Sequence, residues 1–167
     1  MKLLTILLLP LLLLANVEYE EDFKNLTQSQ KDVIQFAFDF GKPTNLSWTL
    51  AAKVWEESNA GENVISTKAH PRYGRDYGIS QNNIYWFLTS RGTGYTKANI
   101  AKFASKLVRD DAYCLQASVD NIHYWQKRYP TDYKEVWAHY NGGNNPNYNY
   151  AGRIAKRIQV LRQHIKQ

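Results

Sequence analysis

Apolar residues recur every three or four positions along most of the chain, which is the period of an α-helix rather than of a β-strand. Thr27 or Ser29 can cap a helix that Gly41 and Pro43 then end, and a second helix is expected over residues 47–58. The apolar side of the first helix is expected to consist of Val33, Phe36, Ala37 and Phe40. The pattern therefore predicts a mainly α protein.

Later apolar sets with the same spacing predict four more helices. They lie within residues 100–107, 115–129, 133–140 and 150–165. Pro130 separates the second set from the third, and residues 141–147, rich in asparagine and glycine, cannot continue a helix. Residues 59–83 are polar and contain several glycines, so they are expected to form a loop or a small hairpin.

The first residues of the chain have a composition of their own. After Lys2, an uninterrupted apolar run extends from Leu3 to Ala15. It is shorter than the roughly 20 residues that a membrane-spanning helix needs, and an acidic stretch follows it. We therefore expect residues 1–16 to be a signal peptide or a short N-terminal anchor, and residues 17–167 to form one domain. The protein is then exported to the periplasm or the extracellular space, and an uncleaved anchor would associate it with a membrane.

The net charge limits the classes of partner that the protein can bind, and the cysteine content limits the interactions that can stabilise its fold. A formal net charge of +6 suits a polyanionic partner such as a cell wall, a nucleic acid or an acidic membrane surface. The basic residues of the last helix are interpreted as its solvated face, so nucleic acid is not an expected partner. The single cysteine, Cys114, excludes an intramolecular disulfide, so packing must stabilise the fold. The scattered histidines offer no ligand spacing, and neither a metal nor a cofactor is expected.

Glu57 stands near the end of the second predicted helix, three residues after Val54 and seven after Leu50. These intervals place it at the edge of the apolar side of the helix, where partial burial raises the pKa of a carboxyl group. A carboxyl group that keeps its proton near neutral pH can act as a general acid. Glu56 instead shares a polar side with Lys53 and is expected to be solvated.

A turn with a second carboxylate, Asp76, follows Glu57 by about twenty residues, which is the layout of a sugar-cleaving site. Three short stretches follow one another along the chain: Glu57-Ser58, Gly78-Ile79-Ser80-Gln81, and His139-Tyr140-Asn141-Gly142-Gly143. In the same order, they resemble the Glu-Ser, Gly-Leu-Met-Gln and Ala-Tyr-Asn-Ala-Gly motifs of lytic transglycosylases of the soluble-lytic-transglycosylase type, within the lysozyme-like superfamily. The resemblance extends from about Lys31 to Leu161.

The resemblance implies a lysozyme-like single domain, with the loop or hairpin beside a catalytic cleft, that binds the glycan strands of peptidoglycan. It implies that Glu57 protonates the glycosidic oxygen between N-acetylmuramic acid and N-acetylglucosamine. As a carboxylate, Glu57 then removes the proton of the muramic C6 hydroxyl, which attacks C1. The expected product is a 1,6-anhydro-muramoyl end, and no cofactor is involved.

The resemblance also implies roles for residues near Glu57. Ser58 and Gln81 are expected to hydrogen-bond the substrate or to steady the site. Tyr140 is expected to help orient the acid, and Asn141 to fix the turn that follows it.

Two further tyrosines are candidate substrate-binding residues. Tyr150 matches a position of the family, and Tyr77 can stack on a sugar, because the C–H faces of sugars pack on aromatic rings. Departures from the family pattern occur at Ser80, where the family has methionine, and at His139 and Gly142, where it has alanines. Substrate contacts near these departures are expected to differ from those of the family.

The segment around Glu57 and Asp76 is also similar to animal-type lysozymes, in which the aspartate of an Asp-Tyr-Gly turn is the second catalytic carboxylate. Asp76 is therefore a candidate catalytic residue of a hydrolytic muramidase, and its alternative role is to hold the turn. The motif around Tyr140 and the absence of paired cysteines favour the transglycosylase. A non-catalytic wall-binding module is the third interpretation. Wall growth, a secretion or conjugation apparatus, or a phage would each suit such a protein.

Overall fold

The computed structural model describes residues 17–165, and the predicted signal peptide or anchor, residues 1–16, lies outside them. A helix over residues 17–24 comes first. The elements that follow are α2 (Gln28–Gly41), the short 3₁₀ helix η1 (Lys42–Thr44), α3 (Ser47–Ser58), β1 (Asp76–Tyr77), β2 (Asn82–Asn83), α4 (Ile84–Thr89), α5 (Lys97–Arg109), α6 (Asp111–Gln126), α7 (Tyr133–Gly142) and α8 (Tyr148–His164). The prediction of a mainly α protein is confirmed. Within residues 17–165, no helix combines the length and apolar character needed to cross a membrane.

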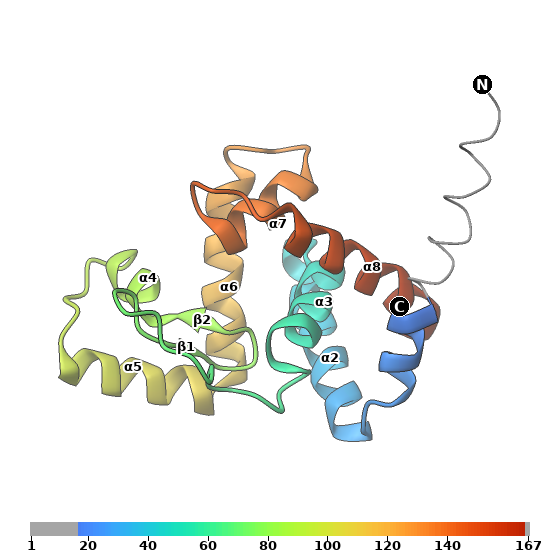
Figure 1. Ribbon diagram of the computed structural model, residues 1–167, viewed down its shortest axis with the longest axis horizontal. Coiled ribbons are helices and arrows are strands. Elements are labelled where there is room, and N and C mark those ends of the chain that lie inside the picture. Colours follow the sequence, from blue (N-terminus) through green and yellow to red (C-terminus); the bar gives the residue numbers. More distant parts are fainter. Residues whose placement is uncertain (1–16, 166–167) are drawn as a thin grey trace.

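Helix α3 is packed on two sides, by α2 and by α8 (Figure 1). Its residues Leu50, Ala51, Ala52 and Val54 have no exposed surface, because apolar side chains occupy more than one side of this helix. Helix α6 contacts α5, α7 and strand β2, and the hairpin extends from α4 and α5 across α6 towards the end of α3. The end of α3 therefore faces the hairpin on one side and α7 and α8 on the other.

Helix α2 begins where the sequence predicts, and its buried side overlaps the predicted one only in part. Thr27 caps it in a capping box with Gln30. The buried apolar residues are Ile34, Ala37 and Phe38, whereas Phe36 is 42% exposed and pairs with the partly buried Phe40. Of the predicted apolar side, Ala37 is buried and Val33 and Phe40 pack against the core, so the prediction was wrong for Phe36 and missed Ile34 and Phe38. The reason is tertiary packing, since Phe38 packs edge-on against Trp48 at the start of α3, with ring centroids 4.6 Å apart.

The polar stretch after α3 contains the expected hairpin. Strands β1 and β2 pair antiparallel, with Asp76 opposite Asn83 and Tyr77 opposite Asn82. The turn between them is Gly78–Gln81, and Gly78 has a φ of 81°. A β-carbon on Gly78 would clash with the Leu107 carbonyl oxygen and the Cys114 sulfur. The glycine therefore lets the turn pack directly on α5 and α6.

The remaining helices correspond to the predicted sets with small shifts at their ends. Helix α7 includes Asn141 and Gly142, and α8 already begins at Tyr148. Helix α4 was not predicted, because six residues are too few to show a helical period. The Asn83 side chain starts α4 by accepting a hydrogen bond from the Trp86 amide.

Candidate active site

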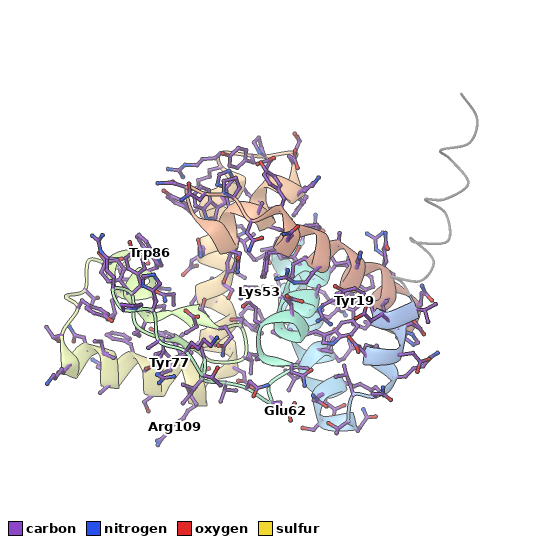
Figure 2. The ribbon with its side chains drawn as sticks, in the orientation of Figure 1. Tyr19, Lys53, Glu62, Tyr77, Trp86 and Arg109 are labelled. Carbon is purple, nitrogen blue, oxygen red and sulfur yellow. The ribbon has the colours of Figure 1, made fainter. Side chains whose placement is uncertain are left out.

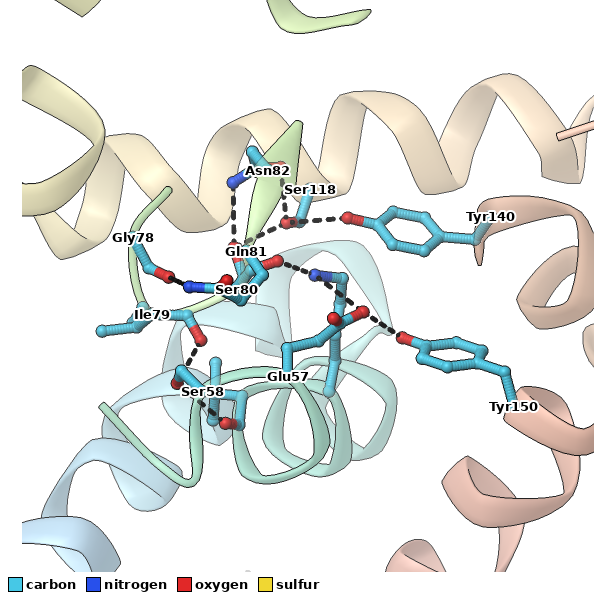
Figure 3. Close-up of polar contacts among 12 residues, drawn as sticks. Glu57, Ser58, Gly78, Ile79, Ser80, Gln81, Asn82, Ser118, Tyr140 and Tyr150 are labelled. Carbon is cyan, nitrogen blue, oxygen red and sulfur yellow. Dashed lines mark hydrogen bonds and ion pairs between the residues drawn. The ribbon is translucent and has the colours of Figure 1, made fainter. Parts of the chain in front are cut away.

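Glu57 lies in the last turn of α3, which ends where Asn59 adopts a left-handed conformation. Its side chain is 17% exposed, as expected of a residue at the edge of the apolar side. The Tyr150 hydroxyl donates a hydrogen bond of 2.7 Å to Glu57 Oε1, and Lys53 Nζ lies 3.9 Å from the same oxygen. In Figure 3, Glu57 lies between the turn 78–81 and the two tyrosines of α7 and α8.

The surroundings of Glu57 favour its protonated form. Burial raises the pKa of its carboxyl group, and the charge of Lys53 and the hydrogen bond from Tyr150 lower it. The carboxylates of Glu56 and Asp76 add to the raising side, and the net shift is upward. Because burial also raises the pKa of Tyr150 well above its usual value, that hydroxyl keeps its proton and acts as the donor. Burial thus favours the protonated form of Glu57, and the Tyr150 hydroxyl supplies a hydrogen bond to its carboxyl group.

The neighbouring Glu56 is not solvated, which corrects the expectation from the sequence. Its two carboxylate oxygens accept hydrogen bonds from Arg153 Nε at 2.5 Å and Arg157 Nε at 2.8 Å, both from α8. The Glu56 side chain is 11% exposed. These arginines were interpreted as part of a solvated face, but they anchor α8 to the end of α3. Glu56 is therefore an ion-paired structural residue beside a protonatable Glu57.

Lys53 is the main residue of the site that the sequence did not identify. Its side chain is 2% exposed, although the helix pattern placed it on a polar side. Its ammonium donates a hydrogen bond to the Ser80 carbonyl and lies 4.6 Å from the centre of the Tyr140 ring. Its position one helical turn before Glu57 was the only sequence signal for this contact. Figure 2 shows Lys53 in the middle of the molecule, between α3 and the C-terminal helices.

Ser58 connects α3 to the hairpin turn. Its hydroxyl lies 2.6 Å from the Ile79 carbonyl oxygen and 3.1 Å from the Val54 carbonyl oxygen, and it accepts a hydrogen bond of 2.8 Å from the Gly61 amide. Ser58 has no exposed surface. Of its two expected roles, the contacts favour steadying the site over binding a substrate.

Gln81 also holds the turn. Its side-chain amide nitrogen lies 2.8 Å from the Asn63 carbonyl oxygen and 3.1 Å from the Gly78 carbonyl oxygen, and its φ is 45°. Tyr77 is half-buried and packs against the core from β1. Gln81 and Tyr77 thus shape the hairpin that faces Glu57.

Asp76 is tied across the hairpin. Its Oδ1 accepts a hydrogen bond of 2.8 Å from Asn83 Nδ2, and its backbone amide donates to Ser66 Oγ at 3.0 Å. Burial raises the pKa of the Asp76 carboxyl group, although the hydrogen bond from Asn83 opposes this shift. These contacts match the turn-holding role considered for this residue.

The departure at Ser80 belongs to a buried polar network beneath the turn. The Ser80 hydroxyl lies 2.7 Å from Ser118 Oγ on α6, and Ser118 also donates to Asn82 Oδ1 at 3.1 Å. The Tyr140 hydroxyl lies 3.4 Å from Ser118 Oγ. Serine at position 80 thus joins the turn to α6 and α7 through hydrogen bonds, where a methionine would offer only apolar contact.

Tyr150, and not Tyr140, is the tyrosine that contacts the acid. Tyr150, from α8, contacts the Glu57 carboxyl directly, whereas Tyr140 reaches Glu57 only through Lys53. Asn141 is exposed, and its Oδ1 accepts a hydrogen bond of 2.8 Å from Asn147 Nδ2. Asn141 therefore closes the loop between α7 and α8, in line with its expected turn-fixing role.

A small cavity of about 10 Å³ lies against Lys53 and both tyrosines. Its lining is Thr49, Lys53, Ile122, Trp137, Tyr140, Tyr150 and Ile154. This volume is at the lower limit for one water molecule. A larger open hollow of about 440 Å³ lies elsewhere, around Trp55 and Arg157. Across residues 17–165, no group of three or more histidine, cysteine, aspartate or glutamate side chains could hold a metal ion.

Comparison of the chain with protein-family models, with curated proteins and with solved structures finds no match. The interpretation of the site therefore depends on its geometry and on the three motifs.

Proposed function

We propose that this protein is a peptidoglycan lytic transglycosylase with a lysozyme-like fold, in which Glu57 is both acid and base. The observation that carries the proposal is the convergence of the three motifs on one carboxyl group. Ser58 binds the Ile79 carbonyl of the second motif, and Lys53 links the Ser80 carbonyl to Glu57 and to the ring of Tyr140 in the third motif. A central helix that ends between a hairpin and two later helices supports the lysozyme-like fold.

The proposed reaction uses one carboxyl group twice, first as an acid and then as a base. Protonated Glu57 gives its proton to the glycosidic oxygen between N-acetylmuramic acid and N-acetylglucosamine as the bond from C1 to that oxygen breaks. The Glu57 carboxylate then takes the proton of the muramic C6 hydroxyl as its oxygen forms a bond to C1. The product carries a 1,6-anhydro ring, water is not consumed, and Glu57 ends protonated. Partial burial, which raises the pKa of Glu57, supports the first step.

A hydrolytic muramidase that pairs Glu57 with Asp76 is the second candidate function. The influence of the Asp76 charge on the pKa of Glu57 supports it. However, the second carboxyl group of such an enzyme must be free to face the reacting sugar carbon. Asn83 binds one oxygen of Asp76, and the Asp76 amide is hydrogen-bonded to Ser66, so the residue is engaged in holding the hairpin. These contacts favour the transglycosylase.

Peptidoglycan glycan strands are the proposed partner, and export to the periplasm or the extracellular space is part of the proposal. The formal charge of +6 supports binding to an anionic wall. The biological settings that suit this activity are wall growth, a secretion or conjugation apparatus, and phage infection.

Mass spectrometry of muropeptides after digestion of purified peptidoglycan tests the proposal. We expect anhydro-muramoyl ends with the wild-type protein and none with Glu57→Gln, which keeps the shape of the side chain but carries no transferable carboxyl proton. Glu62→Gln is the matched control. Glu62 is exposed, and within residues 17–165 its side chain is hydrogen-bonded to Asn59 alone.

Each alternative gives a different product. Reducing ends in place of anhydro ends would establish the hydrolase, and Asp76→Asn would then be inactive. Binding to peptidoglycan with no released product, equal for wild type and Glu57→Gln, would establish the non-catalytic wall-binding module.

A further inference from the structure

The ammonium group of Lys53 is buried, which is rare for a lysine without compensating partners. Three partners surround it: the Ser80 carbonyl as a hydrogen-bond acceptor, the face of the Tyr140 ring at 4.6 Å and the Glu57 carboxyl at 3.9 Å. Burial disfavours the charged form of Lys53, but its neighbours Tyr140 and Glu57 outweigh this effect and its pKa is raised. Lys53 therefore carries a positive charge at the pH values where Glu57 titrates.

The position of this charge matches the place where negative charge develops during proton transfer. Lys53 Nζ and the Tyr150 hydroxyl both approach Glu57 Oε1, the first from within α3 and the second from α8. The other charged groups that influence Glu57, the carboxylates of Glu56 and Asp76, are negative and oppose its ionisation. A fixed cation in a water-poor site stabilises a developing anion without rearrangement during the reaction.

We infer that Lys53 is a positioning residue whose ammonium stabilises the Glu57 carboxylate between its two proton transfers. The inference rests on the proposed function, because it assigns Lys53 to the same reaction. When Glu57 releases its proton to the leaving oxygen, the new carboxylate lies beside the Lys53 ammonium, which the Ser80 carbonyl and the Tyr140 ring hold in place. Lys53 exchanges no proton, and the proton that returns to Glu57 comes from the C6 hydroxyl.

A purely structural role would be to fasten α3 to the turn 78–81 through the Ser80 carbonyl. The two roles differ in their effect on Glu57. A lysine that only joins α3 to the turn affects stability alone. A lysine that interacts electrostatically with Glu57 also sets the pH at which Glu57 loses its proton.

The test is a carboxyl ¹³C NMR titration of Glu57 in the wild-type protein and in Lys53→Met, which removes the charge and keeps a flexible apolar side chain. We expect the pKa of Glu57 to rise by about one unit or more in Lys53→Met, because an opposite charge within about 4–6 Å shifts a carboxyl pKa by about 1–3 units. Lys42→Met, which removes an exposed charge paired with Asp39, should leave the pKa of Glu57 unchanged. An unchanged or lower pKa in Lys53→Met overturns the inference.

A second variant keeps the test decisive where Lys53→Met does not fold. Coupling between two sites is reciprocal, so Glu57→Gln should lower the pKa of Lys53, measured by NMR on the lysine side chain. An unchanged Lys53 pKa in that variant overturns the inference.

Activity separates this inference from the proposed function. If the wild-type protein forms anhydro ends, the alkaline limb of its pH–rate profile reports the loss of the Glu57 proton, and this limb should move to higher pH in Lys53→Met. A limb that stays in place overturns the role of Lys53. A wild-type protein without product overturns the proposed function, and the NMR titration still decides whether Lys53 controls Glu57.

Discussion

The hydrogen bond from Tyr150 to Glu57 gives the sharpest prediction about the proposed activity. Tyr150→Phe removes only the hydroxyl group that lies 2.7 Å from Glu57 Oε1 and leaves the ring that packs in the core. Because this bond favours the carboxylate, its loss raises the pKa of Glu57 and makes its proton harder to release. The substitution should therefore slow the chemical step.

The magnitude follows from the energy of such a bond. A hydrogen bond to a charged group contributes about 1.5–3 kcal/mol, and about 1.4 kcal/mol corresponds to a tenfold change in rate. We expect kcat for the formation of anhydro-muramoyl ends to fall by roughly 10- to 150-fold in Tyr150→Phe. The alkaline limb of the pH–rate profile should move to higher pH, since the pKa of Glu57 rises.

The assay is the initial rate of anhydro-muropeptide release from purified peptidoglycan between pH 4 and pH 9. Tyr148→Phe is the matched control, because its hydroxyl bonds to Glu135 at the surface, at 3.0 and 3.2 Å, and not to Glu57. Wild-type kcat and an unmoved alkaline limb in Tyr150→Phe would refute the reasoning, provided that the variant unfolds at the wild-type temperature.

Three further predictions concern stability. Folding raises the pKa of Glu57, so the contribution of its carboxyl group to stability is fully present below the unfolded pKa and is lost as the pH rises through the folded pKa. Thermal unfolding should therefore show that Glu57→Gln gains more stability over wild type at pH 8 than at pH 4. An equal difference at the two pH values would contradict this. Gly78→Ala should lower the free energy of unfolding by about 3 kcal/mol in urea titrations, from its positive φ and the clash with α5 and α6, whereas Gly92→Ala, with a φ of 63° but open space, should lose only about 1–2 kcal/mol. Ser58→Ala should lower the free energy of unfolding by about 1–3 kcal/mol, because it leaves the Ile79 carbonyl and the Gly61 amide without their partner. KM should not change, because Ser58 has no exposed surface. A raised KM at unchanged stability would instead place Ser58 against the substrate.

Local sequence signals were sufficient for α3 and for the position of Glu57. The helix has the predicted bounds, Ser47–Ser58, because apolar residues at helical spacing precede a residue, Asn59, that tolerates the left-handed conformation. The intervals from Leu50 and Val54 placed Glu57 at the boundary of the core, and its side chain is mostly buried. The hairpin was also predictable in outline, since glycine and polar residues cluster in that stretch.

Partners that lie far away in the sequence explain what could not be predicted. Glu56 is mostly withdrawn from solvent because Arg153 and Arg157, 97 and 101 residues later, supply its counter-charges. Lys53 is buried because a carbonyl 27 residues later and the ring of Tyr140 accommodate its ammonium. A polar residue on a helix is assigned to the solvated side by default, and only the tertiary structure reveals such compensation.

The anchoring of α8 to α3 has a consequence for the order in which the protein becomes competent during synthesis. Glu57 and Tyr150 are 93 residues apart, so α3 leaves the ribosome long before α8. A nascent chain that has not yet added α8 carries Glu57 without its tyrosine and Glu56 without its arginines. Glu57 therefore acquires the hydrogen bond from Tyr150 only when the C-terminal helix docks, and an incomplete chain does not contain the whole candidate site.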